Sequence, residues 1–232
     1  MSRALVLFDL DGCLVDSTDA ITGAIRHAMG ALGLPAPPAD QLRWCIGPPL
    51  HESFATLLAQ AGTGPDRVPE AVDAYRAHYA TTSLSQTTRI PGIEPALAAI
   101  AADATLAVVT SKPGEAAVPI LEQVGLTGWF AAVHAPQADH RVEPKAVTLR
   151  RAQAQLGADG QPQVMIGDRS HDVDAGRACG TATVGVTWGA GDRDELAAAG
   201  ADRIVDVPAD LPATVRLLAG GGRSAGGRSA GS

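Results

Sequence analysis

The chain has 232 residues, of which 46% are hydrophobic and 19% are charged. This is the balance of a folded globular protein, and the length suits one large domain or a core domain that carries a smaller one. The formal net charge of −7 and the lack of a basic patch argue against a nucleic-acid partner, whereas a few local groups suffice to hold a small anionic substrate.

Short apolar runs recur along the chain, and several end at Asp, Thr or Gly. We expect strands at residues 4–8, 105–109, 131–133, 163–166, 181–186 and 203–205. Between the later runs, helical patterns occupy residues 114–124, 145–157, 172–179, 193–199 and 209–218. Strands that alternate with helices predict an α/β protein with a parallel sheet buried on both faces.

Residues 16–89 break this alternation, because their patterns are helical and none is convincingly that of a strand. The helical segments lie near residues 18–32, 39–46, 50–61 and 67–80, with Pro- and Gly-rich stretches between them. RIPG at residues 89–92 supplies a turn at the end of this region. We therefore predict three parts: a core of residues 1–15 and 90–219, a helical domain of residues 16–89, and a disordered Gly/Ser/Arg tail of residues 220–232.

The first apolar run leads directly into two acidic residues, Asp9 and Asp11. Residues two apart in an extended segment point to the same side, so both carboxylates can face one site. Two carboxylates at such a short distance repel each other unless a cation or a shared proton reduces the repulsion. Carboxylate oxygens are also the ligands that Mg²⁺ prefers. Taken alone, the DxDG pattern fits a solvated turn after an edge strand equally well.

A second acidic pair follows the apolar run at 163–166. Asp168 comes directly after that strand, and Asp172 lies four residues on, in the first turn of the next predicted helix. Side chains four residues apart at the start of a helix point in the same direction, and the helix dipole favours acidic residues at this end. Ordinary helix capping also places Asp at the start of a helix. The spacing of Gly and Glu after these residues excludes an EF-hand.

Two further strand ends carry groups that suit an anion. Thr110, Ser111 and Lys112 follow the strand at 105–109, at a point where a helix begins, although a simple Ser/Thr turn explains them as well. Lys145 stands at the start of a helix, where the dipole disfavours a cation. It therefore needs an acidic neighbour, for which Glu143 is available, or an anionic ligand.

In their order along the chain, these four motifs resemble those of the haloacid dehalogenase (HAD) superfamily. The matching elements are DLDGCLVDS (9–17), Thr110, Lys145 and GDRSHD (167–172). WCIGPPL (44–50), RIPGI (89–93), TSKP (110–113) and the stretch 184–202 resemble its phosphoglycolate-phosphatase-like and nucleotidase-like branch. The resemblance implies a Rossmann-like, doubly wound core and an all-helical cap inserted after the first strand.

The resemblance also implies a mechanism, in which a small phosphomonoester is hydrolysed through an aspartyl-phosphate. Asp9 would be the nucleophile and Asp11 the general acid and base, which favours phosphate chemistry over dehalogenation. Mg²⁺ would be held by Asp9, the backbone carbonyl of Asp11 and Asp168, while Asp172 would anchor metal-bound waters. The phosphoryl oxygens and the rest of the substrate would be contacted by Thr110, Lys145, Ser111, Lys112, Arg43 and Gly47.

Other functions are compatible with parts of this pattern. A phosphomutase would use the same aspartyl-phosphate but return the phosphoryl group to a sugar phosphate. A non-catalytic HAD-like binding module would be expected to lack one of the key residues, and a Rossmann dehydrogenase would need a GxGxxG motif after the first strand. Phosphoglycolate, a nucleoside monophosphate and a sugar phosphate all remain compatible substrates.

Cysteine content bears on the cellular compartment. Cys13, Cys45 and Cys179 are odd in number and lack CxxC spacing, so we expect reduced thiols. The N-terminal apolar run is too short for a signal peptide, and no run reaches the length of a membrane span. We expect a soluble, cytoplasmic protein, monomeric or homodimeric.

Cys13 occupies a position where Thr is usual in the superfamily, and we expect activity to survive this change.

Overall fold

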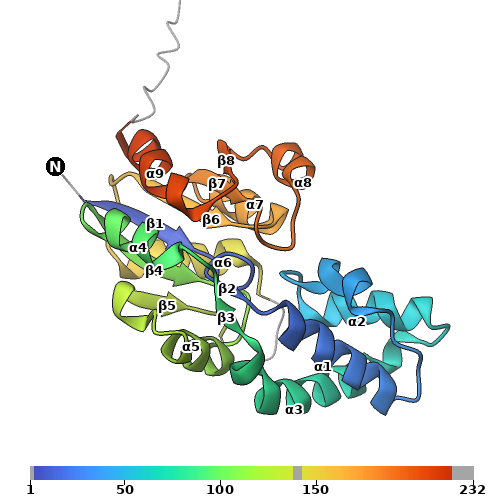
Figure 1. Ribbon diagram of the computed structural model, residues 1–232. Helices are drawn as coiled ribbons and strands as arrows, with labels where there is room; N and C mark the ends of the chain where they lie inside the picture. The colour runs from blue at the N-terminus through green and yellow to red at the C-terminus, as the bar shows by residue number, and fades with distance from the viewer. Residues whose placement is uncertain (1–2, 138–142, 221–232) are drawn as a thin grey trace, which may run out of the picture.

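The centre of the protein is a parallel sheet of six strands. The computed structural model describes residues 3–137 and 143–220, so the predicted tail lies outside the described residues beyond Gly220. The strands are β1 (Ala4–Phe8), β4 (Ala104–Val109), β5 (Ala132–His134), β6 (Gln163–Gly167), β7 (Ala182–Val186) and β8 (Arg203–Val205). They lie in the order β5-β4-β1-β6-β7-β8, and every pairing is parallel (Figure 1). The predicted fold class is confirmed.

Helices cover both faces of this sheet. They are α4 (Ile93–Ala101), α5 (Gly114–Gln123), α6 (Lys145–Gln155), α7 (Ser170–Ala178), α8 (Arg193–Ala198) and α9 (Leu211–Gly220), with short 3₁₀-helices η3 (Thr127–Trp129) and η4 (Pro208–Asp210). Side chains of β1 alternate between two cores: Val6 and Phe8 pack with residues of α4 and α9, and Leu5 and Leu7 with residues of α6. Burial on both faces explains why β1 is continuously apolar. Among the described residues, no helix is both long and apolar enough to cross a membrane.

A second group of helices follows the first strand, as predicted, and lies beside the carboxyl ends of the strands (Figure 1). It consists of α1 (Thr18–Ala31), η1 (Ala39–Cys45), α2 (Leu50–Gln60), η2 (Pro65–Arg67) and α3 (Val68–Gln86), and we call residues 18–86 the helical insert. The segment near 39–46 forms a 3₁₀-helix. Helix α3 continues past residue 80, where our prediction ended, because no Gly or Pro interrupts it before its end.

The structure adds two features at the ends of the helical insert that the sequence patterns did not predict. Strands β2 (Val15–Asp16) and β3 (Thr88–Arg89) form a short antiparallel pair, although we expected no strand between residues 16 and 89. Two residues are too few to display a periodic pattern. Helix α4 was also missed. Pro95 lies in its first turn, where a backbone N–H has no partner within the helix, so this proline does not prevent helix formation.

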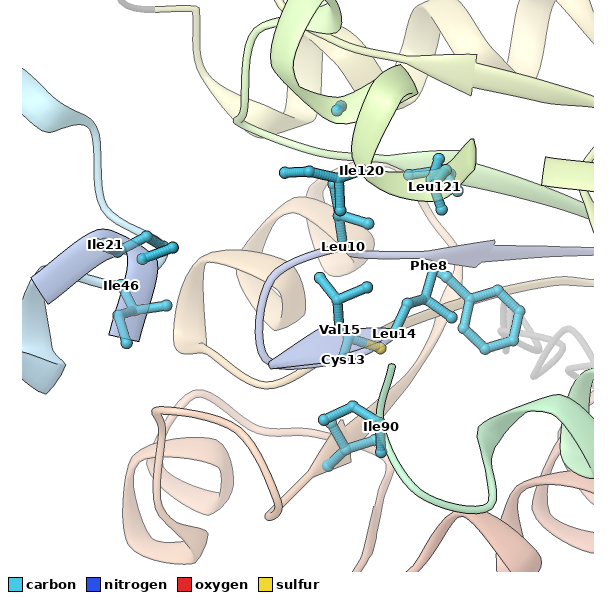
Figure 2. Close-up of a cluster of buried hydrophobic side chains, with 14 of the residues drawn as sticks. Phe8, Leu10, Cys13, Leu14, Val15, Ile21, Ile46, Ile90, Ile120 and Leu121 are labelled. Carbon is cyan, nitrogen blue, oxygen red and sulfur yellow. The ribbon is translucent and has the colours of Figure 1, made fainter. Parts of the chain in front are cut away.

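The helical insert and the sheet share apolar contacts around the turn that follows β1. Figure 2 shows Leu10, Cys13 and Leu14 of this turn among buried side chains from the insert, from α5 and from the segment after β3. Ile21 and Ile46 are the labelled contributors from the insert. The polar residues of the same turn are therefore held in place by a buried apolar support.

We predict that Gly176→Ala destabilises the protein. A Cβ atom at this position of α7 would lie 2.6 Å from Thr183 Cγ2 and 2.8 Å from Thr181 Oγ1, so the helix would have to move away from β7. Overpacking of this kind costs about 1–3 kcal/mol of the free energy of unfolding. Chemical denaturation measures it.

Gly30→Ala is the matched control, because its Cβ meets no atom within 4 Å in α1. It should be neutral or should stabilise by about 0.5–1 kcal/mol, since Ala restricts the unfolded chain. Equal stability of the two variants would contradict the close packing of α7 against β7.

Candidate active site

The strand order brings three of the predicted motifs to one edge of the sheet. Strand β1 pairs with β4 on one side and with β6 on the other. The chain therefore places Asp9, Thr110 and Asp168, which follow these three strands, at adjacent carboxyl ends. Ligands of open α/β sheets bind at this position, beside the point where the strand order reverses.

Three buried carboxylates lie together at this edge. Asp9, Asp168 and Asp172 each offer an oxygen, and these atoms all lie within 4.8 Å of one another. The ammonium of Lys145, at the start of α6, lies 2.8 Å from Asp9 Oδ1 and also contacts Asp172 Oδ1. The other oxygen of Asp172 accepts a hydrogen bond of 3.0 Å from the backbone N–H of Arg169. The group is thus fixed by contacts with two different elements.

Burial disfavours the charged forms of the side chains in this cluster. It raises the pKa of Asp9 to about 7, an effect that Lys145 opposes and Asp172 increases. Burial likewise raises the pKa of Asp168 well above its usual range. Burial by itself lowers the pKa of Lys145, but the nearby carboxylates of Asp172 and Asp9 raise it by more. The pKa of Lys145 therefore lies above its usual value. Three carboxylates and one ammonium leave two negative charges without a partner in this group when all are ionised.

The surroundings of Asp168 fit a small hard cation. Its Oδ2 accepts a hydrogen bond of 2.7 Å from Ala190 N, whereas its Oδ1 is buried and has no hydrogen-bond partner among the described residues. A Cβ atom at Gly12 or at Gly189 would overlap the Asp168 carboxylate, so glycine is needed at both positions. Gly12 also adopts φ +75°, which favours glycine. A buried carboxylate oxygen without a hydrogen-bond partner needs a cation or a proton. Together with the oxygens of the two neighbouring carboxylates, it forms the set of oxygen ligands that Mg²⁺ prefers.

Asp11 has a different environment from Asp9. Its Oδ1 accepts a hydrogen bond of 2.5 Å from Ser17 Oγ, and its Oδ2 lies 3.1 Å from the ammonium of Lys112. Its carboxylate does not belong to the group formed by Asp9, Asp168 and Asp172. The two carboxylates that the sequence presents as a pair therefore have separate partners.

The remaining predicted core residues lie near these carboxylates. Thr110 is buried, and its Oγ1 accepts a hydrogen bond of 3.1 Å from Lys112 N. Ser111 is partly exposed beside it. The carboxylate of Glu143, which offered a simple partner for Lys145, instead pairs with Arg151 at 2.8 Å. Lys145 therefore pairs with the carboxylates of Asp9 and Asp172 and not with Glu143.

The predicted residues of the helical insert lie where it meets the loops after β6 and β7. Arg43 donates a hydrogen bond of 2.9 Å to Gly189 O. Gly47 adopts φ +100°, and a Cβ atom there would come within 2.9 Å of Arg169 Cγ. Arg169 in turn donates hydrogen bonds to the carbonyls of Trp44 and Ile46. Both predicted residues therefore take part in the contact between the insert and the core.

Sequence reasoning missed three residues that contact this site. Ser17 lies within the first motif and could have been noticed there, because a hydroxyl six residues after Asp11 follows a tight turn. Arg169 lies within the fourth motif, but nothing in the pattern indicated its contact with residues 44–46. Tyr79, which binds Lys112, lies in the middle of a long helix, and only its aromatic character distinguished it.

Cys13 lies outside this polar network. Its side chain is fully buried in the apolar cluster of Figure 2, and its Sγ lies 3.7 Å from the carbonyl oxygen of Ile166. Burial raises the pKa of this thiol well above its usual value. A buried neutral thiol of this kind behaves as a small apolar side chain, and the expectation that activity survives the change from Thr stays a prediction.

The protein thus combines a parallel sheet of this strand order, acidic residues after β1 and β6, and a helical insert after β1. The model of the haloacid dehalogenase-like hydrolase family matches residues 6–186, and the chain belongs to this family. The resemblance inferred from the four motifs is confirmed.

Relatives and a solved structure extend this comparison. The chain is 39% identical over 194 residues to the tyrosine-protein kinase PtkA of Mycobacterium tuberculosis, covering 83% of this chain but only 65% of that protein. It is 36% identical over 211 residues to a phosphoglycolate phosphatase of Cupriavidus necator, covering 90% and 91% of the two chains. A predicted phosphatase from Clostridium acetobutylicum superposes with a TM-score of 0.85 at 30% identity, covering 93% and 99%.

We predict that Lys145→Met destabilises the metal-free protein more at about pH 8 than at about pH 5. Burial raises the pKa of Asp9 to about 7 even though Lys145 lowers it, so without this ammonium Asp9 must stay neutral to remain buried. At the lower pH, Asp9 is protonated at little cost. Denaturant unfolding in the presence of EDTA at the two pH values measures the difference.

Arg193→Met is the control for this comparison. Arg193 pairs with Asp206 at 2.6 Å, but the two side chains are 53% and 63% exposed. An exposed pair of this kind contributes little to stability because solvent screens it, and the control should show little change between the two pH values. A pH-independent loss of stability in Lys145→Met would contradict the proposed charge balance.

Proposed function

We propose that the protein is a Mg²⁺-dependent phosphatase that hydrolyses a small phosphomonoester through an aspartyl-phosphate on Asp9. The observation that carries this proposal is the separation of the two carboxylates after β1. Asp9 lies with Asp168, Asp172 and Lys145, whereas Asp11 lies between Ser17 and Lys112. Family membership and the relatives named as phosphatases support it.

Asp9, Asp168 and the backbone carbonyl of Asp11 would hold Mg²⁺, with Asp172 orienting its waters. When bound, the cation offsets negative charge on the phosphoryl group and on the carboxylates. The Oδ1 atom of Asp168, which has no hydrogen-bond partner among the described residues, is the atom best suited to bind the cation. Lys145 holds Asp9 through Oδ1 and adds positive charge where phosphoryl oxygens would lie. The Thr110 hydroxyl, at the end of β4, can donate a hydrogen bond to one of these oxygens.

In the first step, a carboxylate oxygen of Asp9 attacks phosphorus, and the bond from phosphorus to the leaving oxygen breaks. Asp11, which must carry a proton at this point of the reaction, gives it to that oxygen, so that an alcohol leaves. In the second step, a water attacks the phosphorus of the aspartyl-phosphate, and the bond from phosphorus to the Asp9 oxygen breaks. Asp11, now ionised, takes up one proton of the water. Inorganic phosphate leaves, and both carboxyl groups return to their starting states.

The helical insert would supply contacts to the rest of the substrate and limit access of water. Arg43 and the segment around Gly47 lie at its contact with the core, close to the loop that carries Asp168. A phosphomutase would return the phosphoryl group to its substrate. Release of inorganic phosphate distinguishes the two reactions directly.

We predict that Asp9→Asn abolishes phosphate release from a panel of phosphomonoesters in the presence of Mg²⁺. The amide cannot act as the nucleophile, and a loss of at least about 10³-fold is expected. Asp11→Asn should lose about 10²- to 10⁴-fold, because it can neither donate nor accept the proton. Colorimetric detection of inorganic phosphate measures both.

Asp174→Asn is the matched control, since Asp174 is an exposed residue of α7 near the same motif. It should retain the activity of the unchanged protein. Appreciable turnover by a verified Asp9→Asn protein would refute the assignment of the nucleophile.

We also predict that Mg²⁺ raises the thermal stability more at about pH 7.5 than at about pH 5. The pKa of Asp9 is about 7 in the metal-free folded protein, whereas in an unfolded chain an Asp titrates near pH 4. The folded state therefore binds more protons between these values, and its stability falls as the pH rises through them. Because Mg²⁺ binds the ionised carboxylates, its effect on Tm increases over the same interval.

Scanning calorimetry with EDTA or with excess Mg²⁺ at both pH values tests this without measuring activity. Asp168→Asn should lose most of the increase in Tm at both pH values, because it removes one ligand. An increase that is the same at both pH values in the unchanged protein would contradict the linkage.

A further inference from the structure

Lys112 connects the helical insert to the carboxylate of Asp11. Its side chain is only 7% exposed, and its ammonium lies 3.1 Å from Asp11 Oδ2. The same ammonium donates a hydrogen bond of 2.6 Å to the hydroxyl of Tyr79 and lies 4.5 Å from the centre of the tyrosine ring. Lys112 follows strand β4 of the core, whereas Tyr79 belongs to α3 of the insert. A buried chain of two contacts therefore joins α3 to Asp11.

The position of Tyr79 is fixed by its aromatic neighbours. Its ring stacks on Tyr75, one turn earlier in α3, with 5.3 Å between the ring centres and 12° between the planes. Tyr75 in turn meets the edge of Phe54 of α2 at 6.1 Å. All three side chains are buried. The hydroxyl of Tyr79 is thus a stationary acceptor rather than a mobile surface group.

We propose that Tyr79 is a positioning residue for Asp11 and that it acts through Lys112. This inference rests on the proposed function, in which Asp11 transfers the proton to the leaving oxygen. Ser17 fixes Oδ1 of Asp11, and the Tyr79-Lys112 chain fixes Oδ2. The carboxylate plane is therefore set by one contact from the start of α1 and one from α3.

The lysine needs this second partner because its side chain is long and flexible. Without the Tyr79 oxygen, the buried ammonium would lose a hydrogen-bond acceptor and would move to recover one. Asp11 Oδ2 would then be held less firmly. Proton transfer depends on placement, and a shift of about 1 Å can cost about 10²-fold in rate.

The test is Tyr79→Phe, which removes the acceptor oxygen but keeps the ring that contacts Lys112 and Tyr75. The measured quantity is kcat/KM, because it reports the steps up to cleavage of the bond to the leaving group. For an alkyl phosphate, whose leaving oxygen needs a proton, we expect a decrease of about 10- to 100-fold. For p-nitrophenyl phosphate, whose leaving group departs without a proton, we expect a decrease of less than about two-fold.

A merely structural role for Tyr79 would lower both values by the same factor, and that result would overturn the proposal. So would an unchanged value for the alkyl phosphate. Tyr75→Phe is the matched control, because it removes a buried hydroxyl from the same helix while keeping the ring stack. It should change both values by less than about two-fold. Calorimetry of each variant establishes that the fold is retained.

Double substitution tests whether Tyr79 acts through Lys112. Lys112→Met should show the same selective loss on the alkyl phosphate as Tyr79→Phe, or a larger one. If Tyr79 acts only through the ammonium, the Tyr79→Phe, Lys112→Met double variant should be no slower than Lys112→Met alone. Multiplicative losses would show that Tyr79 has an independent role and would overturn the proposal.

Asp11→Asn distinguishes failure of this inference from failure of the proposed function. If Asp11 is the general acid, its loss must itself be larger for the alkyl phosphate than for p-nitrophenyl phosphate. Equal losses would refute the acid role of Asp11 and with it the basis of the inference. A selective loss in Asp11→Asn together with none in Tyr79→Phe would refute the positioning role alone.

Discussion

The burial of three carboxylates beside a single ammonium is the constraint on which the rest of the site depends. Asp9 and Asp168 leave adjacent strands, and Asp172 is brought to them by the first turn of α7. Lys145 contacts Asp9 and Asp172 from the start of α6. Carboxylates held this close in a buried place need either protons or a cation. The apolar sheet and the glycines that admit the Asp168 carboxylate therefore support a charge arrangement that is unfavourable by itself.

The environments of Asp9 and Asp11 support the different parts that we propose for these two similar side chains in one reaction. Asp9 faces other carboxylates and an ammonium, whereas Asp11 receives one hydroxyl and a different ammonium. Environments that differ in this way are how proteins divide the roles of nucleophile and proton carrier between two acids. The division arises over two residues of chain, because the turn after β1 directs the carboxylates to different neighbours.

The helical insert contributes to the site through contacts with several parts of the core. Arg43 binds the loop after β7, Arg169 of the core binds carbonyls of residues 44–46, and Tyr79 binds Lys112. Together with the apolar cluster of Figure 2, these contacts join the insert to the loops that carry the acidic residues. The position of the insert and the geometry of the site are consequently coupled, which is how a distant helix can influence a carboxylate after β1.

The sequence by itself determined the alternation of strands and helices, the helical insert and the order of the acidic, hydroxyl and lysine motifs, because these are properties of short segments. Two-residue strands and a helix with Pro95 in its first turn lacked such a local signal. Only the tertiary structure decided the partners. Lys145 meets Asp172 across 27 residues instead of pairing with Glu143, and Lys112 meets Tyr79 across 33. Contacts between segments so far apart form only when the sheet is assembled and the insert packs beside it.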